Sequence, residues 1–392
     1  MRSLFHMALL ILMPCLLVEC AGPSSSGQAT SIVQQPTNTP TYGPTNVSAL
    51  PMPSVETLRR SVSTATSLPT RTILYGPTDV SALPTIAPTP APSPAWSYPI
   101  GRPGQPLGDG FFVRHGYETE NTWYNPGYWH TGEDWYAVNN GETAGAHVYA
   151  VAGGTVVYAG SNYPGRVVIV QHAGGLFSMY GHLDFNLLVQ NGAQVARGQP
   201  LGAVLKRSDD VPSHLHFEIR TFLTADAVNG PHPRYGFRCG PNCPPGPGYW
   251  PIRAPDLPSD LGWRMPTHVI NGRMFAPEAQ APLGQVVVTT RPVSASVMLW
   301  SAPGDSSAQM LEQLALQPGA RFPLLGVHVG PEDQRETSAA GYELWYRIGL
   351  PDGRDGWVQA AVPSTFEIGS DERPSSVYFN MVPAVSAISS AP

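Results

Sequence analysis

The stretch His214-Leu215-His216-Phe217-Glu218-Ile219 alternates polar and apolar residues, which is the pattern of a β-strand that buries one face. Successive side chains of a strand point to opposite faces, so His214 and His216 project to the same side, about 6.7 Å apart along the backbone. Two imidazoles placed in this way can converge on one metal ion. A histidine pair on a strand is more often exposed or structural, so it indicates a site only if further ligands accompany it.

Further candidate ligands occur in the stretch His130-Thr131-Gly132-Glu133-Asp134. Imidazole nitrogens and carboxylate oxygens are both common zinc ligands, and Gly132 lets the chain bend so that His130 and Asp134 can meet at one point. Another histidine lies in the stretch Tyr180-Gly181-His182-Leu183. Each group alone is common by chance, whereas the three in this order are not. From the spacing alone, His214 remains open as a ligand or as a residue beside the metal.

In their order and context these groups resemble the lysostaphin and LytM-type zinc endopeptidases. The resemblance is close over residues 131–220 and looser over residues 110–130. Framing segments rich in Gly and Val share it, namely residues 153–160, 167–172 and 192–202.

The resemblance implies that His130, Asp134 and His216 bind one catalytic Zn²⁺ and that His182 and His214 are catalytic residues. Three protein ligands leave a fourth position for water, as a catalytic zinc site requires. Zinc lowers the pKa of bound water, and a neutral histidine can take its proton as the water attacks a peptide carbonyl. Which of the two histidines is the base stays open.

Three features depart from the family pattern or are ambiguous in it. Glu133 stands where the family has an aliphatic residue, and we expect its side chain to point away from the ligands. The loop at residues 206–213 is charged where the family is rich in Gly, Ser and Thr, which leaves substrate preference open. The family also has an upstream aromatic donor, for which Tyr124 and Tyr128 are both candidates.

Short alternating segments separated by Gly and Asn turns predict a mainly β fold class. We expect an antiparallel β-sheet peptidase domain over residues 98–225. Its predicted strands are two within residues 147–159, then residues 166–172, 176–183, 199–205 and 214–221.

The later part of the chain is predicted to hold a second β unit. Residues 226–280 are rich in loops and are expected to extend the first domain. Residues 285–366 resemble a small SH3-like β-barrel, since 344–348 and 356–358 are apolar segments joined by a Pro-Asp-Gly turn; another small barrel is the alternative. We expect residues 370–392 to be a disordered tail.

The beginning of the chain is typical of an exported protein. Residues 1–20 are predicted to be a signal peptide, because the apolar run at 4–18 is shorter than a membrane span requires. Residues 21–97 form a Pro/Thr/Ser-rich linker that we expect to be disordered. Cys20 stands where a bacterial lipoprotein is cleaved, but Glu19 departs from such sites, so lipid anchoring at Cys20 and simple secretion are both open.

Composition excludes some partners. The net charge of -6 and the lack of a basic stripe argue against nucleic acid. We expect a monomer outside the cytoplasm, secreted or anchored to the cell envelope, with no membrane contact except a lipid on Cys20. Cys239 and Cys243 are spaced for a disulfide in an exported chain, although the sequence does not establish the bond.

The function predicted from these features is a metalloendopeptidase that hydrolyses peptide bonds in peptidoglycan stem or cross-bridge peptides. The alternative is a non-catalytic cell-wall-binding or amidase-activating protein on the same fold. Degenerate relatives of that kind lack ligands, whereas all five site positions are filled here. A peptidase of secreted proteins is a third candidate, and the SH3-like segment favours the wall only by analogy.

Overall fold

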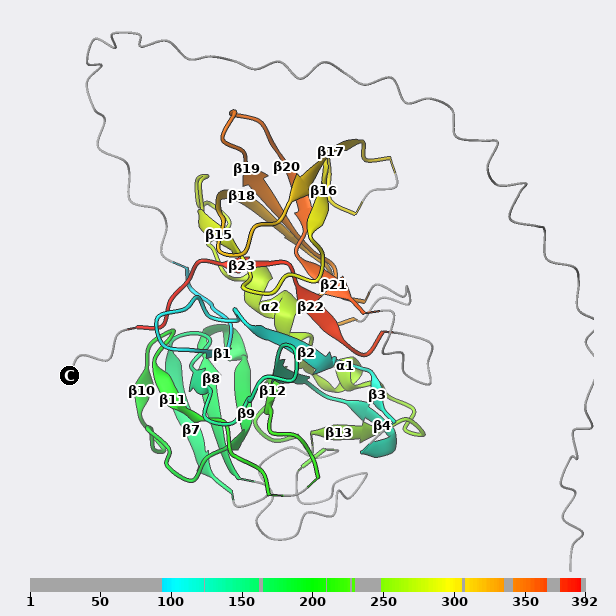
Figure 1. Ribbon diagram of the computed structural model, residues 1–392. Coiled ribbons are helices and arrows are strands. Elements are labelled where there is room, and N and C mark those ends of the chain that lie inside the picture. The colour runs from blue at the N-terminus through cyan, green and yellow to red at the C-terminus, as the bar shows by residue number, and fades with distance from the viewer. Residues whose placement is uncertain are drawn as a thin grey trace, which may run out of the picture. The chain divides into compact units, whose positions relative to one another are not determined.

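The computed structural model (Figure 1) describes residues 94–122, 124–161, 165–208, 210–225, 228–229, 248–304, 307–334, 341–364 and 374–388. The predicted signal peptide, the linker up to residue 93, and Cys239 and Cys243 lie outside the described residues. Trp96 and Ser97 are buried, so the packed structure begins before the boundary predicted at residue 98. Among the described helices, none combines the length and hydropathy needed to cross a membrane.

The largest sheet has ten strands and carries most of the residues that the sequence analysis singled out (Figure 1). Along the sheet the order is β10 (Gln194–Val195), β7 (Gly154–Gly160), β8 (Arg166–His172), β9 (Phe177–Leu183), β12 (Leu215–Arg220), β5 (Glu133–Ala137), β2 (Phe111–His115), β22 (Val377–Phe379) and β21 (Ala361–Pro363), and β14 (Trp263–Arg264) pairs with β12. All of its pairings are antiparallel.

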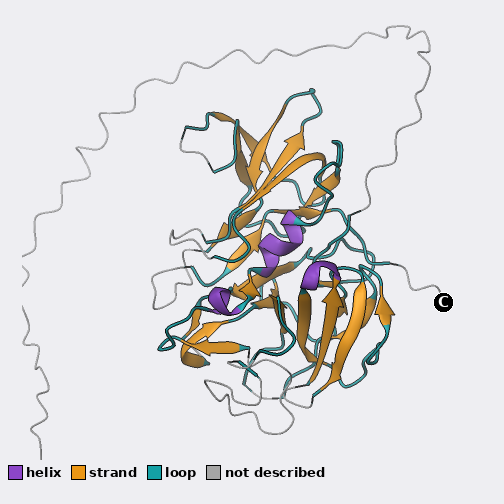
Figure 2. Cartoon of the chain, turned by 180° about the vertical axis from the view of Figure 1, so that it is seen from behind, coloured by secondary structure: helices purple, strands orange, loops and turns teal. Residues whose placement is uncertain are grey.

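Three smaller sheets, two short α-helices and one 3-10 helix complete the described structure, and Figure 2 shows how little of it is helical. One sheet joins β1 (Ile100–Gly101), β6 (His147–Tyr149) and β11 (Pro200–Ala203), and another joins β13 (Tyr249–Pro251), β4 (Asn125–His130) and β3 (Glu120–Asn121). The seven-stranded sheet runs β17 (Met310–Ala315), β16 (Ser296–Trp300), β20 (Asp355–Gln359), β19 (Leu344–Gly349), β18 (Arg321–Val329), β15 (Gly284–Val288), β23 (Met381–Pro383). The α-helices are α1 (Pro258–Leu261) and α2 (Pro266–Gly272), and the 3-10 helix is η2 (Ala173–Gly175).

The predicted fold class is confirmed: the protein is mainly β and its sheets are antiparallel. Each strand predicted between residues 147 and 221 is present, as β6, β7, β8, β9, β11 and β12. Period-two alternation located them correctly because Leu215, Phe217 and Ile219 of β12 are all fully buried in the core.

The segment expected to be a loop-rich extension, residues 226–280, contributes more regular structure than predicted. It contains β13, α1, β14 and α2, and the pairing of β14 with β12 makes it part of the largest sheet. Proline at the start of each helix suits the first helical turn, where a backbone N–H has no partner within the helix. The sheet therefore extends beyond the predicted domain limit at residue 225.

The expectation of a disordered tail over residues 370–392 is wrong for residues 374–388. They contain β22 and β23, and Val377, Phe379 and Val382 are buried. The ring of Phe379 stacks on Trp135, with 5.4 Å between centroids and 7° between planes. The strands are too short to give a clear periodic signal, and their stability comes from partners that are distant in sequence.

Residues 284–359 form most of the second β unit, the seven-stranded sheet. The predicted strand-turn-strand at its end is confirmed, since β19 and β20 pair in antiparallel register from Trp345–Gln359 to Gly349–Asp355. The sheet also takes in β23, whose Val382 pairs with Val287. The SH3-like identity of this unit stays a prediction.

We predict that Phe379→Ala destabilises the protein by about 3–5 kcal/mol, because it removes a buried ring from the core beside Trp135 and Tyr98. Urea denaturation followed by tryptophan fluorescence would measure the change. Ile388→Ala is the control, since that side chain is 45% exposed and its loss should cost less than about 0.5 kcal/mol. Equal stability of both variants would contradict the packing described for β22.

Candidate metal centre

One row of directly opposed residues crosses the largest sheet and builds the site. His115 of β2 pairs with Asp134 of β5, Asp134 pairs with His216 of β12, and His216 pairs with Gly181 of β9. Opposed residues on neighbouring strands project to the same face, so the register alone brings Asp134 and His216 together. Gly181 leaves space for the His216 side chain, because a Cβ at position 181 would lie only 3.3 Å from the Cβ of His216.

His130 joins the row from the end of β4, where Thr131 and Gly132 connect it to β5. The turn passes so close to β12 that a Cβ on Gly132 would lie 2.3 Å from the carbonyl oxygen of Phe217. Glycine is thus required for the close approach of two backbones, a more specific reason than the chain bend expected from the sequence.

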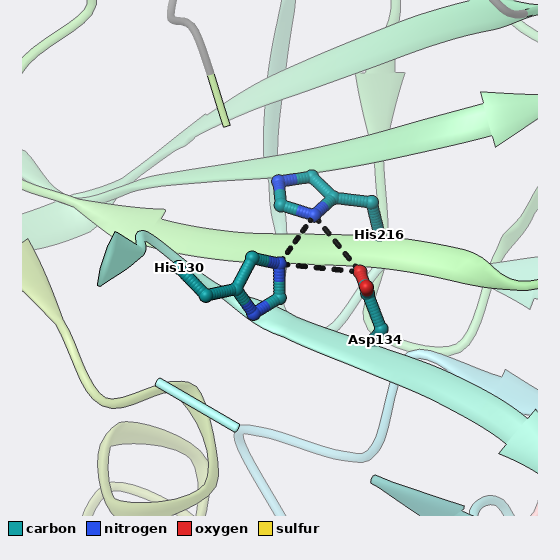
Figure 3. A group of neighbouring side chains, drawn as sticks. All are labelled: His130, Asp134 and His216. Carbon is teal, nitrogen blue, oxygen red and sulfur yellow. Dashed lines mark hydrogen bonds and ion pairs between the residues drawn. The ribbon is translucent and has the colours of Figure 1, made fainter. Parts of the chain in front are cut away.

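The three predicted ligands converge in the structure (Figure 3). His130 Nε2 lies 3.0 Å from His216 Nδ1 and 3.3 Å from Asp134 Oδ1, and His216 Nδ1 lies 3.0 Å from the same oxygen. Ligand atoms of a tetrahedral zinc ion, with bonds near 2.0–2.1 Å, are about 3.3 Å apart. The donor set and its spacing therefore fit one zinc ion.

The second nitrogen of each ligand histidine is also engaged. His130 Nδ1 lies 3.3 Å from the carbonyl oxygen of Gly116, and His216 Nε2 lies 3.0 Å from Glu218 Oε1. Both partners are hydrogen-bond acceptors, so these nitrogens donate and leave His130 Nε2 and His216 Nδ1 for the metal. This outer contact fixes the ring orientation, as at most histidine metal sites.

Glu218 is itself held by a buried network. Its Oε1 accepts a hydrogen bond from the Thr131 hydroxyl at 2.8 Å, and its Oε2 accepts one from Trp263 Nε1 at 3.0 Å. Arg220 Nη1 lies 3.5 Å from Oε2. Burial by itself raises the pKa of Glu218, but the hydrogen bond from His216 and the charge of Arg220 outweigh it and hold the pKa at about 2.

The three candidate ligands, His130, Asp134 and His216, form the triad. Their electrostatics favour an ionised Asp134 carboxylate. Burial raises the pKa of Asp134, but His130 and His214, which are protonated at the low pH where a carboxylate titrates, outweigh it, so the pKa lies well below its usual value. Burial lowers the pKa of His216, yet hydrogen bonds to Asp134 and Glu218 raise it to about 9. Without a metal, His216 therefore carries a proton that a metal ion must displace.

His214 lies beside the triad and outside it. Its Nδ1 donates to the carbonyl oxygen of Pro212 at 2.8 Å, which leaves Nε2 unprotonated in the neutral ring, 3.7 Å from Asp134 Oδ2. The Tyr136 ring stacks on it at 4.9 Å. Burial is the main cause that lowers the pKa of His214, so the ring is neutral at pH 7.

His182 is half-buried and faces the same region, with its ring centroid 4.6 Å from that of His214 and 6.2 Å from that of His216. Its φ of 58° is in the left-handed region, which costs energy for a residue with a Cβ. Such strain persists where the surrounding structure imposes it and is concentrated at functional sites. The structure thus gathers all five predicted site residues around one point.

The structure also resolves the direction of the Glu133 side chain. Glu133 points away from the ligands, as expected, because its carboxylate accepts hydrogen bonds from Trp135 Nε1 at 3.2 Å and from the Thr267 N–H at 3.0 Å. Burial raises its pKa to about 7. Of the two tyrosine candidates, Tyr124 is 39% exposed and lies with its ring 6.4 Å from that of His115.

Sequence reasoning missed three residues of the site. Tyr136 and Glu218 were signalled by alternation, since each follows a predicted ligand by two positions and shares its face. His115 carried no signal, because its place depends on pairing with Asp134 across a bulge. Its ring is 6% exposed, and neither nitrogen has a hydrogen-bond partner among the residues that the structure describes. Burial lowers its pKa to about 4.

Comparison with known protein families identifies the family of the region that contains the triad. The model of Peptidase family M23 matches residues 129–230. This segment is an M23 peptidase domain. The resemblance seen in the sequence is thereby confirmed for the domain, whose family is zinc-dependent and includes proteins that act on peptidoglycan.

Curated relatives of the M23 domain cover a small part of the chain. A protein named Lipoprotein NlpD/LppB homolog, from Pseudomonas aeruginosa, is 45% identical over 78 residues, which are 19% of this chain and 26% of the relative. Murein hydrolase activator EnvC, from Escherichia coli, is 38% identical over 104 residues, 26% of this chain and 24% of the relative. The chain thus spans about a quarter of the length of either relative.

Solved structures similar to this one include lysostaphin, determined by NMR in solution. The similarity covers 69% of this chain and 94% of that chain, at 14% sequence identity and a TM-score of 0.28.

We predict that Glu218→Gln weakens zinc binding by the M23 domain about 10- to 100-fold, the usual effect of losing an outer carboxylate partner. Competition with a chelating dye at pH 9 would measure it, since proton competition at His216 is small there. Glu278→Gln, at an exposed glutamate, should leave the affinity unchanged, and thermal melting would show that both variants fold. Unchanged zinc affinity in Glu218→Gln would contradict the role assigned to this carboxylate.

We predict that the apparent zinc affinity falls about tenfold when the pH is lowered from 8 to 7. Both values lie below the pKa of about 9 of His216, so zinc must displace one proton throughout this range. Calorimetry in two buffers of different ionisation enthalpy would count the protons released at pH 7. An affinity that is constant between pH 7 and 8 would show that His216 is not protonated in the metal-free protein.

Proposed function

We propose that the protein is a zinc-dependent endopeptidase that hydrolyses peptide bonds of bacterial peptidoglycan, in stem or cross-bridge peptides. The observation that carries the proposal is the triangle of His130 Nε2, Asp134 Oδ1 and His216 Nδ1, with sides of 3.0–3.3 Å. Three ligands leave a tetrahedral zinc ion one position for water or substrate, which distinguishes catalytic from structural sites.

His130, Asp134 and His216 would hold the ion, and Gly116 and Glu218 fix the two imidazole rings from behind. When bound, zinc supplies Lewis-acid polarisation of a peptide carbonyl and lowers the pKa of a bound water. One carboxylate and two neutral imidazoles leave a net positive charge at the ion, which favours both effects.

His214 is the residue that we assign as general base. Its Nδ1–H is committed to the carbonyl oxygen of Pro212, so the basic Nε2 faces the triad. The stacked ring of Tyr136 restricts its orientation. Nε2 would take the proton of the attacking water and return it to the amine nitrogen as the peptide bond breaks.

His182 is the residue that we assign to stabilise the developing oxyanion. It is more accessible than His214 and its ring lies 4.6 Å from it, so both can contact one peptide group. A donor held in place before the reaction stabilises this charge more effectively than mobile water. The strained backbone of His182 supports such a fixed position.

A second candidate function is that of a non-catalytic wall-binding or amidase-activating protein. The printed name of the Escherichia coli relative, murein hydrolase activator, favours it. The enzymatic proposal is better supported here, because His130, Asp134, His182, His214 and His216 are all present and gathered together.

The surroundings proposed for the enzyme follow from its relatives and its sequence. Relatives named as lipoproteins support a location in the cell envelope. We propose that the protein acts there as a monomer on wall peptides, with the SH3-like unit as a wall-binding module. Lipid anchoring at Cys20 and simple secretion both fit this location.

We predict that His214→Ala lowers the rate of hydrolysis of purified peptidoglycan at least about 100-fold, as expected for loss of a general base. Release of new amino termini, followed by mass spectrometry of the fragments, would measure the rate and identify the bond. A chelator should abolish the activity and added zinc should restore it. His147→Ala, at an exposed histidine of β6, should act like the unaltered protein.

Two outcomes would decide against the enzymatic proposal. Equal digestion by His214→Ala and the unaltered protein would exclude the assigned base. If neither protein cleaves, and addition of either stimulates a purified amidase, the activator function is correct.

A further inference from the structure

A cavity of about 760 Å³ opens beside the metal centre and is not used by the mechanism above. Its walls come from β2, from the turn after β5, from the loop before β12 and from β22. The residues that the argument uses are Phe112, Arg114, Tyr136, Lys206, Arg207 and Tyr378.

Tyr136 connects this cavity to the site of hydrolysis. One side of the residue lines the cavity, while its hydroxyl lies 3.1 Å from His214 Nδ1. Pro212 and Ser213, which immediately precede His214, also line the cavity. A peptide whose bond lies at the metal would therefore place a neighbouring residue in the cavity.

Among the described residues that line the cavity, positive charges outnumber negative ones, in a chain whose net charge is -6. Of the lining residues that the structure describes, Arg114, Lys206 and Arg207 are cations, and Glu142 and Asp210 carry carboxylates. The carboxylate of Glu142 accepts a hydrogen bond from the Ala144 N–H at 3.0 Å, within its own turn. The Arg114 guanidinium lies over the Tyr136 ring, 5.6 Å from the centroid.

Resting on the proposed function, we propose that this cavity is a subsite for a substrate residue that bears a carboxylate, next to the bond that is cleaved. Arginine and lysine form charge-assisted hydrogen bonds with carboxylates, and these are stronger than bonds between neutral groups. A stem peptide with a free acidic side group uses these cations, whereas a bridge made only of glycine does not. The enzyme therefore prefers acidic stem peptides to neutral bridges.

The aromatic wall of the cavity gives the subsite its apolar part. Tyr378 of β22 stacks on Phe112 of β2, with 4.5 Å between ring centroids and 6° between planes. Together with Tyr136 they offer a surface for the aliphatic carbons that carry the carboxylate. A strand of the largest sheet that comes from near the end of the chain thus helps to select the substrate.

Two tetrapeptides would test the subsite: alanyl-D-glutamyl-lysyl-D-alanine and its D-glutamine counterpart, both acetylated and amidated at their ends. The glutamyl carboxylate is then the single difference in charge. Calorimetry with the zinc-loaded full chain carrying His214→Ala would measure binding without hydrolysis. We expect the acidic peptide to bind about tenfold tighter than the amide, which corresponds to one charge-assisted hydrogen bond.

Variants on the same background locate the effect. Lys206→Gln together with Arg207→Gln should reduce the ratio of the two affinities to near one. Arg321→Gln, at an exposed arginine of β18, should keep the tenfold ratio. Tyr378→Ala should weaken both peptides alike and leave the ratio unchanged.

Three outcomes would each overturn the subsite. The two peptides could bind with equal affinity, the double variant could leave the ratio of their affinities unchanged, or neither peptide could bind at millimolar concentration. Digestion of peptidoglycan by the protein with His214 intact separates this result from the proposed function. A protein that digests the wall but binds both peptides equally keeps the endopeptidase proposal and loses the subsite. One that binds the acidic peptide selectively but never cleaves keeps the subsite and loses the endopeptidase.

Discussion

The register between β5 and β12 is the constraint on which the site depends. It sets Asp134 opposite His216, while Trp135 and Phe217 project to the other face and are fully buried. A slip of one residue would exchange the two faces and place the ligands in the core, at a large cost in buried polar groups. The hydrophobic burial that fixes the strand pairing therefore also fixes the geometry of the ligands.

The buried charges beneath the ligands are stable because each has a partner. Asp134, His216, Glu218 and Arg220 are all buried, and an isolated charge at such depth would be strongly destabilising. Contacts run in sequence from Asp134 to His216, then to Glu218 and Arg220, so opposite charges alternate through the layer. Networks of this kind are cooperative, so the orientation of the three candidate ligands depends on residues outside the triad.

Most of the correct predictions, of strands and of site residues, came from patterns within short stretches of sequence. The strands β6, β7, β8, β9, β11 and β12 follow from period-two alternation, and the five site residues lie in short motifs whose spacing is visible without a structure. His115 could not be found in this way, because its position depends on a bulge between β2 and β5. The strands β22 and β23 were missed for a similar reason, since residues far away in sequence determine their burial. Long-range pairing leaves no local signature in three-residue strands.

The pairing of β22 with β2 affects the order in which the protein can be made. Translation proceeds from the amino end, so β2 and β5 are synthesised long before Val377, which pairs with Val113. Until that late segment emerges, β2 lacks its neighbour and Trp135 lacks the ring that stacks on it. The M23 domain sequence is then complete, but its sheet is not. A nascent chain thus carries the side chains of the candidate metal centre before the sheet that positions them is complete, which delays maturation until most of the polypeptide has been produced.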